Sequence, residues 1–247
     1  MKLFLCLLVG AVFANTVTAN ELTFESGDKQ TVMVELFTSE GCNSCPPAER
    51  QLNQYRKNPQ LWKIFIPVAW HVDYWDYLGW KDRFSSAAYS DRQRRYARVH
   101  RSNTVYTPNF VVNGLNWRPG IFSGLPQPAT GSVGNLKVKL KNGILSAHLM
   151  HASALPKRLQ LNVALLGMGL VSNIKAGENA GRRALHEFVA LSHQTADSTD
   201  SHWQLALGSG HESASSASAI AVWVSRPGDP VPLQAAGAPL AGHAIQD

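Results

Sequence analysis

Two cysteines three positions apart stand where a strand-like segment gives way to a helix-like one. Cys42 and Cys45 follow the apolar, β-branched run 31–37 and precede Pro46-Pro47, a pair typical of a first helical turn. The partial positive charge at a helix N-terminus lowers the pKa of a nearby thiol and makes it a nucleophile. The spacing indicates redox chemistry, because a disulfide that closes so small a loop contributes little to stability.

The first nineteen residues have the pattern of a signal peptide. Lys2 precedes an apolar stretch over 3–13, and small and polar residues lead to a cleavage position between Ala19 and Asn20. The stretch is shorter than the roughly 20 residues that span a bilayer, and no later segment approaches that length. The pattern predicts a periplasmic or secreted protein without a transmembrane segment in the mature chain, which loses Cys6 with its leader.

Export leaves three interpretations of the cysteine pair open: a redox-active pair, a metal site, and an inert disulfide. The net charge of the chain does not distinguish these three interpretations. The net charge is +6, and basic residues between Lys81 and Arg101 account for the excess in the mature chain. We interpret this stretch as a solvated helix face and predict no nucleic-acid partner.

The first half of the chain has the pattern of an α/β domain. The run 31–37 predicts a strand covered on both faces, and Asn113-Gly114 predicts a tight hairpin turn. The elements expected in this half are a strand over 31–37, a helix that begins at Pro46, a strand over 62–70, a helix over 86–101, and a hairpin of 110–112 with 115–117.

This order resembles the thioredoxin superfamily over about residues 30–120. More narrowly, the motifs at 34–42, 45–47, 71–76 and 106–108 are similar to a family of exported bacterial proteins, the domain of unknown function 1223. The superfamily resemblance implies a thioredoxin-like α/β domain. It does not extend to redox direction, because the dipeptide between the cysteines, Asn-Ser, differs from those of well-studied members.

The resemblance also implies roles for particular residues. We expect Cys42 to be the exposed, attacking thiolate and Cys45 to be the buried, resolving one. It implies that Pro108 has a cis peptide bond near the sulfurs, which leaves the Thr107 backbone free to pair with an extended substrate. The alternative for Pro108 is a trans proline that enters an edge strand.

Acidic residues and a histidine complete the expected site. The resemblance implies that Glu35 is a buried base for Cys45; the alternative is a half-exposed Glu35 paired with a lysine or arginine. His71 and Asp73 follow the second strand at its carboxyl end, where they would bind substrate or tune the thiolate. His71 with both thiols would instead suit copper or zinc, and in a third interpretation it is packed in an aromatic loop.

From Asn135 the chain alternates between apolar and polar residues, with Asn142-Gly143 as a turn and one of the later strands expected over 185–191. This pattern predicts a thioredoxin-like domain over 20–130 and an all-β, sandwich-like domain over 131–247. We expect the second domain to bind a partner or shield the sheet, and the tail after Pro230 to be loosely held.

The sequence thus predicts a thiol-disulfide oxidoreductase that acts on protein or small-molecule thiols or disulfides without a prosthetic group. Two alternatives are a periplasmic protein that binds copper or zinc through the same thiols and His71, and a non-catalytic interaction module.

Overall fold

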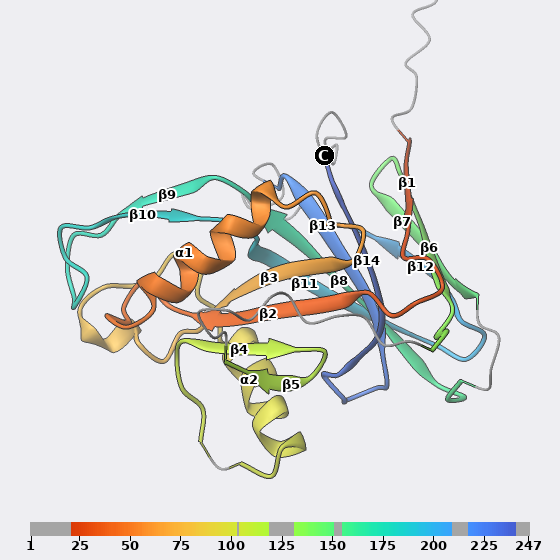
Figure 1. Ribbon diagram of the computed structural model, residues 1–247, viewed down its shortest axis with the longest axis horizontal. Helices are drawn as coiled ribbons and strands as arrows, with labels where there is room; N and C mark the ends of the chain where they lie inside the picture. Colours follow the sequence, from red (N-terminus) through yellow and green to blue (C-terminus); the bar gives the residue numbers. More distant parts are fainter. Residues whose placement is uncertain (1–20, 103, 119–130, 151–154, 209–216, 241–247) are drawn as a thin grey trace, which may run out of the picture.

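The described part of the chain folds mostly into β-strands, with two short α-helices (Figure 1). The computed structural model describes residues 21–102, 104–118, 131–150, 155–208 and 217–240. The predicted signal peptide lies outside these residues. Within them, no helix is both long enough and apolar enough to cross a bilayer.

A mixed eight-stranded sheet takes strands from both halves of the chain (Figure 1). Its order is β14-β13-β8-β11-β3-β2-β4-β5, and β3 runs parallel to both β2 and β11 while the other neighbours are antiparallel. The strands are β2 (Val32–Thr38), β3 (Phe65–His71), β4 (Asn109–Val112), β5 (Leu115–Trp117), β8 (Leu159–Gly167), β11 (Val189–Ser198), β13 (Ala219–Ser225) and β14 (Pro232–Pro239).

β2 and β3 are buried along their whole length. Strands covered on both faces are apolar at nearly every position, and this is the pattern that predicted them. Both predictions are confirmed, with a shift in the second. β3 begins at Phe65 instead of Trp62, because Trp62 adopts a left-handed φ of 66° in the turn before the strand.

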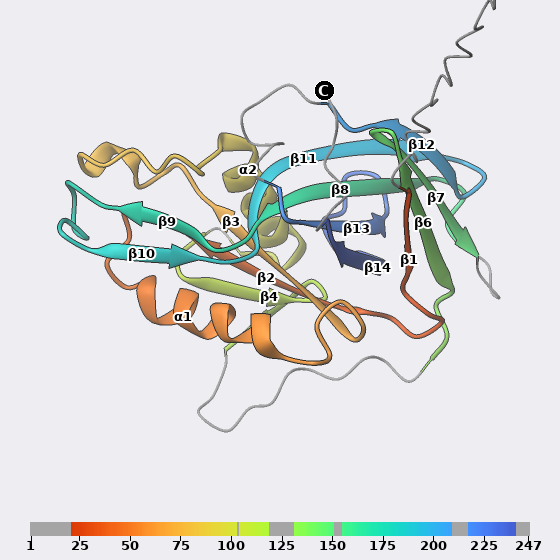
Figure 2. The same ribbon diagram turned by 90° about the horizontal axis from the view of Figure 1, so that it is seen from above.

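Two helices cover opposite faces of these strands (Figure 2). α1 (Pro46–Gln54) continues into a 3-10 turn, Tyr55–Lys57, and packs Ala48 and Leu52 on one face of β2. α2 (Ala87–Val99) packs Tyr89 and Tyr96 on the other face. A second 3-10 turn, Asp76–Leu78, lies in the loop between β3 and α2.

The two Asn-Gly turns form the hairpins that the sequence predicts. Asn113 and Gly114 have φ values of 45° and 85° between β4 and β5, and Asn142 and Gly143 have 51° and 72°. Positive φ at both central residues gives the turn a twist that matches paired strands. The second turn joins β6 (Asn135–Lys141) to β7 (Ile144–Met150).

A second sheet packs against part of the first and forms a sandwich-like layer pair. It has the order β1-β6-β7-β12, with β1 at Glu21–Glu25 and β12 at His202–Ala206. Its inward side chains share an apolar core with those of β8, β13 and β14. This arrangement gives the alternating pattern of β6 and β7, in which one face is buried and the other is wet.

The predicted boundary near residue 130 does not separate two sheets. The backbone N–H and C=O groups of β3 that face away from β2 need hydrogen-bond partners. Residues from the second half of the chain provide them: the Ala69 N–H donates to the Phe188 carbonyl at 2.8 Å. β1, from the N-terminal segment, pairs with β6. The fold is therefore β-rich, and one sheet takes strands from both sides of the predicted boundary.

Two further predictions about the second half are wrong. Residues 232–239 of the segment after Pro230 form β14, which pairs with β13 and is largely buried, so this part is not loosely held. Residues 241–247 lie outside the described part of the chain. The strand expected over 185–191 is divided by Phe188, which has a φ of 60°. Its first part instead forms β10 (Arg183–His186), which pairs with β9 (Leu170–Asn173) in a separate two-stranded ribbon.

Candidate functional site

The two cysteines form a disulfide at the start of α1. Cys45 is the N-cap residue, Pro46 follows it in the first turn, and the Cys42 and Cys45 Cα atoms are 5.5 Å apart. Both residues are fully buried, so the expectation that Cys42 is exposed is wrong. Trp75 packs directly on Gly41, and Asn179 Nδ2 donates to the Cys42 carbonyl at 2.9 Å, so residues distant in sequence contact the segment that holds the pair.

The Thr107-Pro108 peptide bond is cis, as the resemblance implies. It immediately precedes β4, which runs antiparallel to β2. The Thr107 hydroxyl accepts a hydrogen bond from Trp75 Nε1 at 2.8 Å. A groove of about 260 Å³ is lined by the start of α1 and by the cis-proline segment, through Ser44, Pro47, Ala48, Gln51, Tyr106, Pro108, Phe110, Trp117 and Arg118.

Glu35 lies on the face of β2 that α2 covers, whereas the disulfide belongs to the helix on the other face. Its carboxylate accepts hydrogen bonds from Arg92 Nε at 2.6 Å and Trp70 Nε1 at 2.8 Å, and from the Tyr96 hydroxyl. We call Glu35, Trp70, Arg92 and Tyr96 the arginine cluster. The alternative of an arginine partner is therefore right, although Glu35 is fully buried instead of half-exposed. Its position gives no support to a role as base for Cys45.

His71 is held by an aspartate from the loop before α2. It is 1 % exposed, and its Nδ1 lies 2.6 Å from Asp82 Oδ2. Burial alone would raise the pKa of Asp82, but the charge and hydrogen bond of His71 lower it below its usual value. Within the described residues, His71 Nε2 is buried and has no hydrogen-bond partner.

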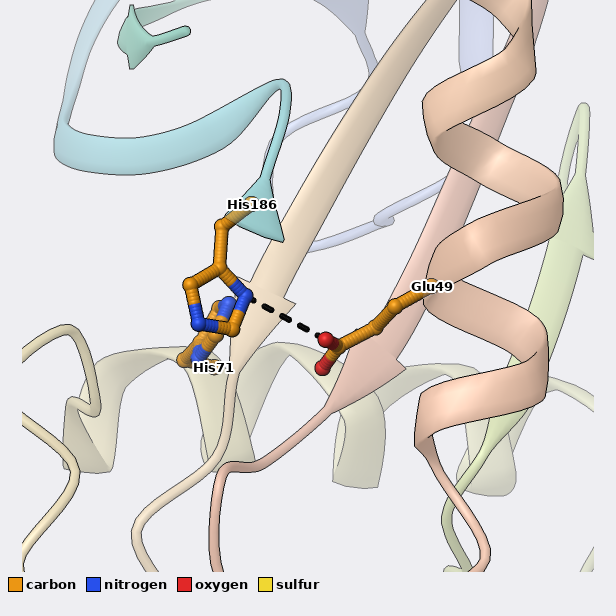
Figure 3. A group of neighbouring side chains, drawn as sticks. All are labelled: Glu49, His71 and His186. Carbon is orange, nitrogen blue, oxygen red and sulfur yellow. Dashed lines mark ion pairs between the residues drawn. The ribbon is translucent and has the colours of Figure 1, made fainter. Parts of the chain in front are cut away.

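His186, at the end of β10, completes a cluster that the sequence did not reveal (Figure 3). Its Nε2 lies 3.1 Å from Glu40 Oε1, and its Nδ1 lies 3.2 Å from Glu49 Oε2, without the geometry of a hydrogen bond. One ligand atom from each of Glu49, His71 and His186 lies within 4.8 Å of the others. We call these three residues the histidine cluster.

The carboxylates control the ionisation of this cluster. Burial disfavours the charged form of His186, but the hydrogen bond to Glu40 and the negative charges of Glu40 and Glu49 outweigh this effect and raise the pKa of His186 to about 10. Burial likewise opposes ionisation of Glu49, yet His186, His71 and Thr38 lower the pKa of this carboxyl. The geometry therefore favours a positive charge between the two glutamates.

Asp73 was also expected at the site from the sequence, but it belongs to neither cluster. Its carboxylate accepts a hydrogen bond from the Ser90 hydroxyl, and its N–H donates to Ser90 Oγ at 3.2 Å. These contacts tie the loop after β3 to α2. Asp76 likewise accepts from Ser85 Oγ at 2.8 Å, so both aspartates stabilise the loop.

A larger groove borders the histidine cluster. It has a volume of about 700 Å³, and Glu40, Glu49 and His186 form part of its wall. Four basic residues also line it: Arg50, Lys57, Arg182 and Arg183. Glu49 follows Cys45 by one helical turn, and this spacing could have identified it from the sequence as a residue near the cysteine pair. His186 had none, because it occurs within a strand-like pattern far along the chain.

Comparisons with known proteins identify relatives of the sequence and the fold. A family model described as "Protein of unknown function (DUF1223)" matches residues 33–225. No curated protein matches the sequence. The fold is similar to protein AGR_C_4864 from Agrobacterium tumefaciens, with a TM-score of 0.62 and 22% identity over 86% of this chain and 95% of that one. It is also similar to HBP35 of Porphyromonas gingivalis, with a TM-score of 0.53 and 12% identity over 86% of this chain and 76% of that one.

Proposed function

Because the chain belongs to the DUF1223 family of proteins of unknown function, its activity has to be inferred from its own residues, and we propose that it is an exported thiol-disulfide exchange protein. The reacting groups are Cys42 and Cys45. The substrate is a thiol or disulfide of a protein or of a small molecule, and the exchange needs no prosthetic group.

The arrangement of strands around the disulfide supports a thioredoxin-like core. Parallel β2 and β3 are joined through α1, and antiparallel β4 and β5 continue the sheet on the other side of β2. The cysteine pair precedes α1 and the cis-proline precedes β4, the two positions that the superfamily resemblance implies. In this proposal β11 and the strands beyond it extend the core at the edge of β3.

A groove shared by the start of α1 and the cis-proline supports the proposal most directly. Ser44 and Pro47 line it from the helix, and Tyr106 and Pro108 line it from the segment before β4. An extended substrate bound there brings its sulfur close to the cysteine pair. The exposed ring of Tyr106 offers apolar surface for the neighbouring substrate residue.

The exchange proceeds in two displacement steps. A substrate thiolate attacks Cys42 Sγ, the Cys42–Cys45 bond breaks, and Cys45 leaves as a thiolate. A second substrate thiolate then attacks the substrate sulfur of this mixed disulfide and releases the Cys42 thiolate, so the substrate dithiol is oxidised and the pair is reduced. The reverse sequence reduces a substrate disulfide. Ser44 Oγ, 3.3 Å from Cys42 Sγ, is positioned to donate a hydrogen bond to the thiolate.

Exchange at a buried disulfide requires a local opening. Trp75 is the side chain best placed to control it, because it packs on Gly41 and donates to the Thr107 hydroxyl. Substitution of Trp75 by alanine should therefore speed the reaction of the reduced protein with a thiol-alkylating reagent. Ser102→Ala, on an exposed loop, is a control that should leave this rate unchanged.

The function is tested by insulin reduction and by oxidation of a reduced model protein. Activity should be abolished in Cys42→Ser, and Cys45→Ser should accumulate a mixed disulfide, because the resolving thiolate is missing. Ser44→Ala should slow exchange, whereas Asn43→Ala, at the exposed position beside it, should not. A folded wild-type protein that exchanges no faster than a free thiol in both directions would contradict the proposal.

A further inference from the structure

The inner nitrogens of the two clustered histidines are buried without a hydrogen-bond partner. Within the described residues, His71 Nε2 and His186 Nδ1 both lack one, and each side chain is 1 % exposed. An unpaired polar atom buried away from water costs about 1–3 kcal/mol, so each such atom in a folded protein calls for an explanation. Both atoms belong to one cluster with Glu49 (Figure 3).

The outer nitrogen of each ring is bound to a carboxylate. Asp82 accepts from His71 Nδ1, and Glu40 lies 3.1 Å from His186 Nε2. A histidine that binds a metal commonly donates its other N–H to a carboxylate, which orients the ring and makes the inner nitrogen more basic. The inner nitrogens, His71 Nε2 and His186 Nδ1, are then the atoms that can bind a metal ion, which would take the place of the proton on His186 Nδ1.

Glu49 is arranged in the same way. Its Oε1 accepts a hydrogen bond from the Thr38 hydroxyl at 2.6 Å, and its Oε2 lies 3.2 Å from His186 Nδ1. The carboxylate is therefore oriented by one oxygen and presents the other to the two rings. The three side chains come from α1, β3 and β10, whose packing fixes their relative positions.

A proton alone explains only part of this arrangement. Protonation of His186 Nδ1 would neutralise the negative charge of Glu49, but it would leave His71 Nε2 unpaired. A cation among the three ligand atoms satisfies both nitrogens and balances the buried carboxylates of Glu40, Glu49 and Asp82.

We propose that Glu49, His71 and His186 bind one divalent first-row transition-metal ion, independently of the cysteine pair. Two imidazoles and one carboxylate suit such ions and leave coordination positions open for water or an exogenous ligand. The groove of about 700 Å³ that Glu49 and His186 border provides the path for the ion. This ligand set contains no sulfur, so it differs from a site built from the thiols and His71.

Zn²⁺ titration of the metal-stripped mature protein tests the site. Calorimetry together with elemental analysis after dialysis should give one tightly bound Zn²⁺ per chain. His71→Gln, His186→Gln and Glu49→Gln should each weaken binding by more than about 100-fold, and Asp82→Asn or Glu40→Gln by about 10–100-fold. His71→Gln keeps an N–H donor for Asp82 but has no basic nitrogen for a metal ion, so the variant should remain folded.

Three controls separate this site from other sources of binding. His193→Gln removes a partly buried histidine outside the cluster, and His202→Ala removes an exposed ring that stacks on His148. The Cys42→Ser/Cys45→Ser double variant removes both thiols. All three should bind Zn²⁺ as the wild-type protein does, and the double variant does so whether or not the proposed thiol exchange is correct.

Spectroscopy on the wild-type protein avoids dependence on variants that fail to fold. Co²⁺ in the site should give visible absorption of a nitrogen- and oxygen-ligated ion without sulfur-to-cobalt charge-transfer bands. The proposal is overturned by a folded wild-type protein that binds no Zn²⁺, by unchanged binding in a His71→Gln/His186→Gln double variant, or by loss of binding in the cysteine double variant.

Discussion

Two clusters of buried ionisable side chains lie on either side of β2, and they differ in how completely their polar atoms are paired. Among the described residues, no buried atom of the arginine cluster lacks a partner, because Arg92, Trp70 and Tyr96 all bind the Glu35 carboxylate. The histidine cluster instead holds two ring nitrogens that have no hydrogen-bond partner, and the one on His186 has only an ion pair with Glu49. The fold explains the arginine cluster, whereas the ring nitrogens of the histidine cluster support the proposed metal site.

Two histidines, His186 and His193, show how neighbouring charges change the pKa of a ring. Glu40 and Glu49 overcome the effect of burial and raise the pKa of His186 to about 10. Burial, followed by the charges of Arg92 and Arg95, lowers the pKa of His193 to about 3. The neighbouring charge therefore decides which histidine is protonated, because both rings are largely removed from water.

Breaking the arginine cluster should have the largest effect. Glu35→Gln leaves the buried Arg92 without a counter-charge, which we expect to lower the free energy of unfolding by about 3–5 kcal/mol. Urea denaturation measures this change. Glu49→Gln is the matched variant and should cost only about 1 kcal/mol, because Glu40 still pairs with His186. Equal losses in the two variants would remove the distinction between the clusters.

Filling the histidine cluster should stabilise the protein by a slightly smaller amount. Free Zn²⁺ at a hundred times its dissociation constant should raise the free energy of unfolding by about 2.7 kcal/mol, because the ion binds only the folded state. Thermal unfolding with and without Zn²⁺ measures the gain. The His71→Gln/His186→Gln double variant should show no gain, and a gain of the same size there would place the ion elsewhere.

Removal of the disulfide should have a smaller effect again. The chain-entropy relation gives about 2 kcal/mol for a loop between residues separated by three positions, less than for most disulfides. Urea denaturation of the Cys42→Ser/Cys45→Ser double variant against the oxidised wild-type protein measures it. A much larger loss would mean that the disulfide has a mainly structural role, in contrast to the exchange function proposed for it.

The smallest expected effect is a pH dependence that comes from His193. Unfolded His193 binds a proton below about pH 6.5, but the native ring does not until about pH 3, so stability falls as the pH decreases through this window. Between pH 7.5 and pH 5.5, the free energy of unfolding of the wild-type protein should fall by about 1 kcal/mol more than that of His193→Gln. Parallel pH profiles for the two proteins would show that neither burial nor the neighbouring arginine charges lower the pKa of this ring in the folded protein.

Local pattern was enough to identify the first half of the fold. The continuous apolar runs of β2 and β3, the Pro46 start of α1 and the two Asn-Gly hairpins all depend on interactions between residues close in sequence. The cis bond before Pro108 was implied only by a family resemblance, because a single sequence does not distinguish a cis proline from a trans one.

Long-range packing decided the rest. Pairing of β11 with β3 brought strands from both halves of the chain into one sheet. Cys42, which was expected to be exposed, is buried, and Asn179, far along the chain, donates to its carbonyl. The histidine cluster joins Glu49, His71 and His186, which are widely separated along the chain. The sequence by itself determined which segments form strands, helices and turns, because those preferences act over a few residues. Only the tertiary structure decided which side chains meet, because that depends on how distant segments pack around one sheet.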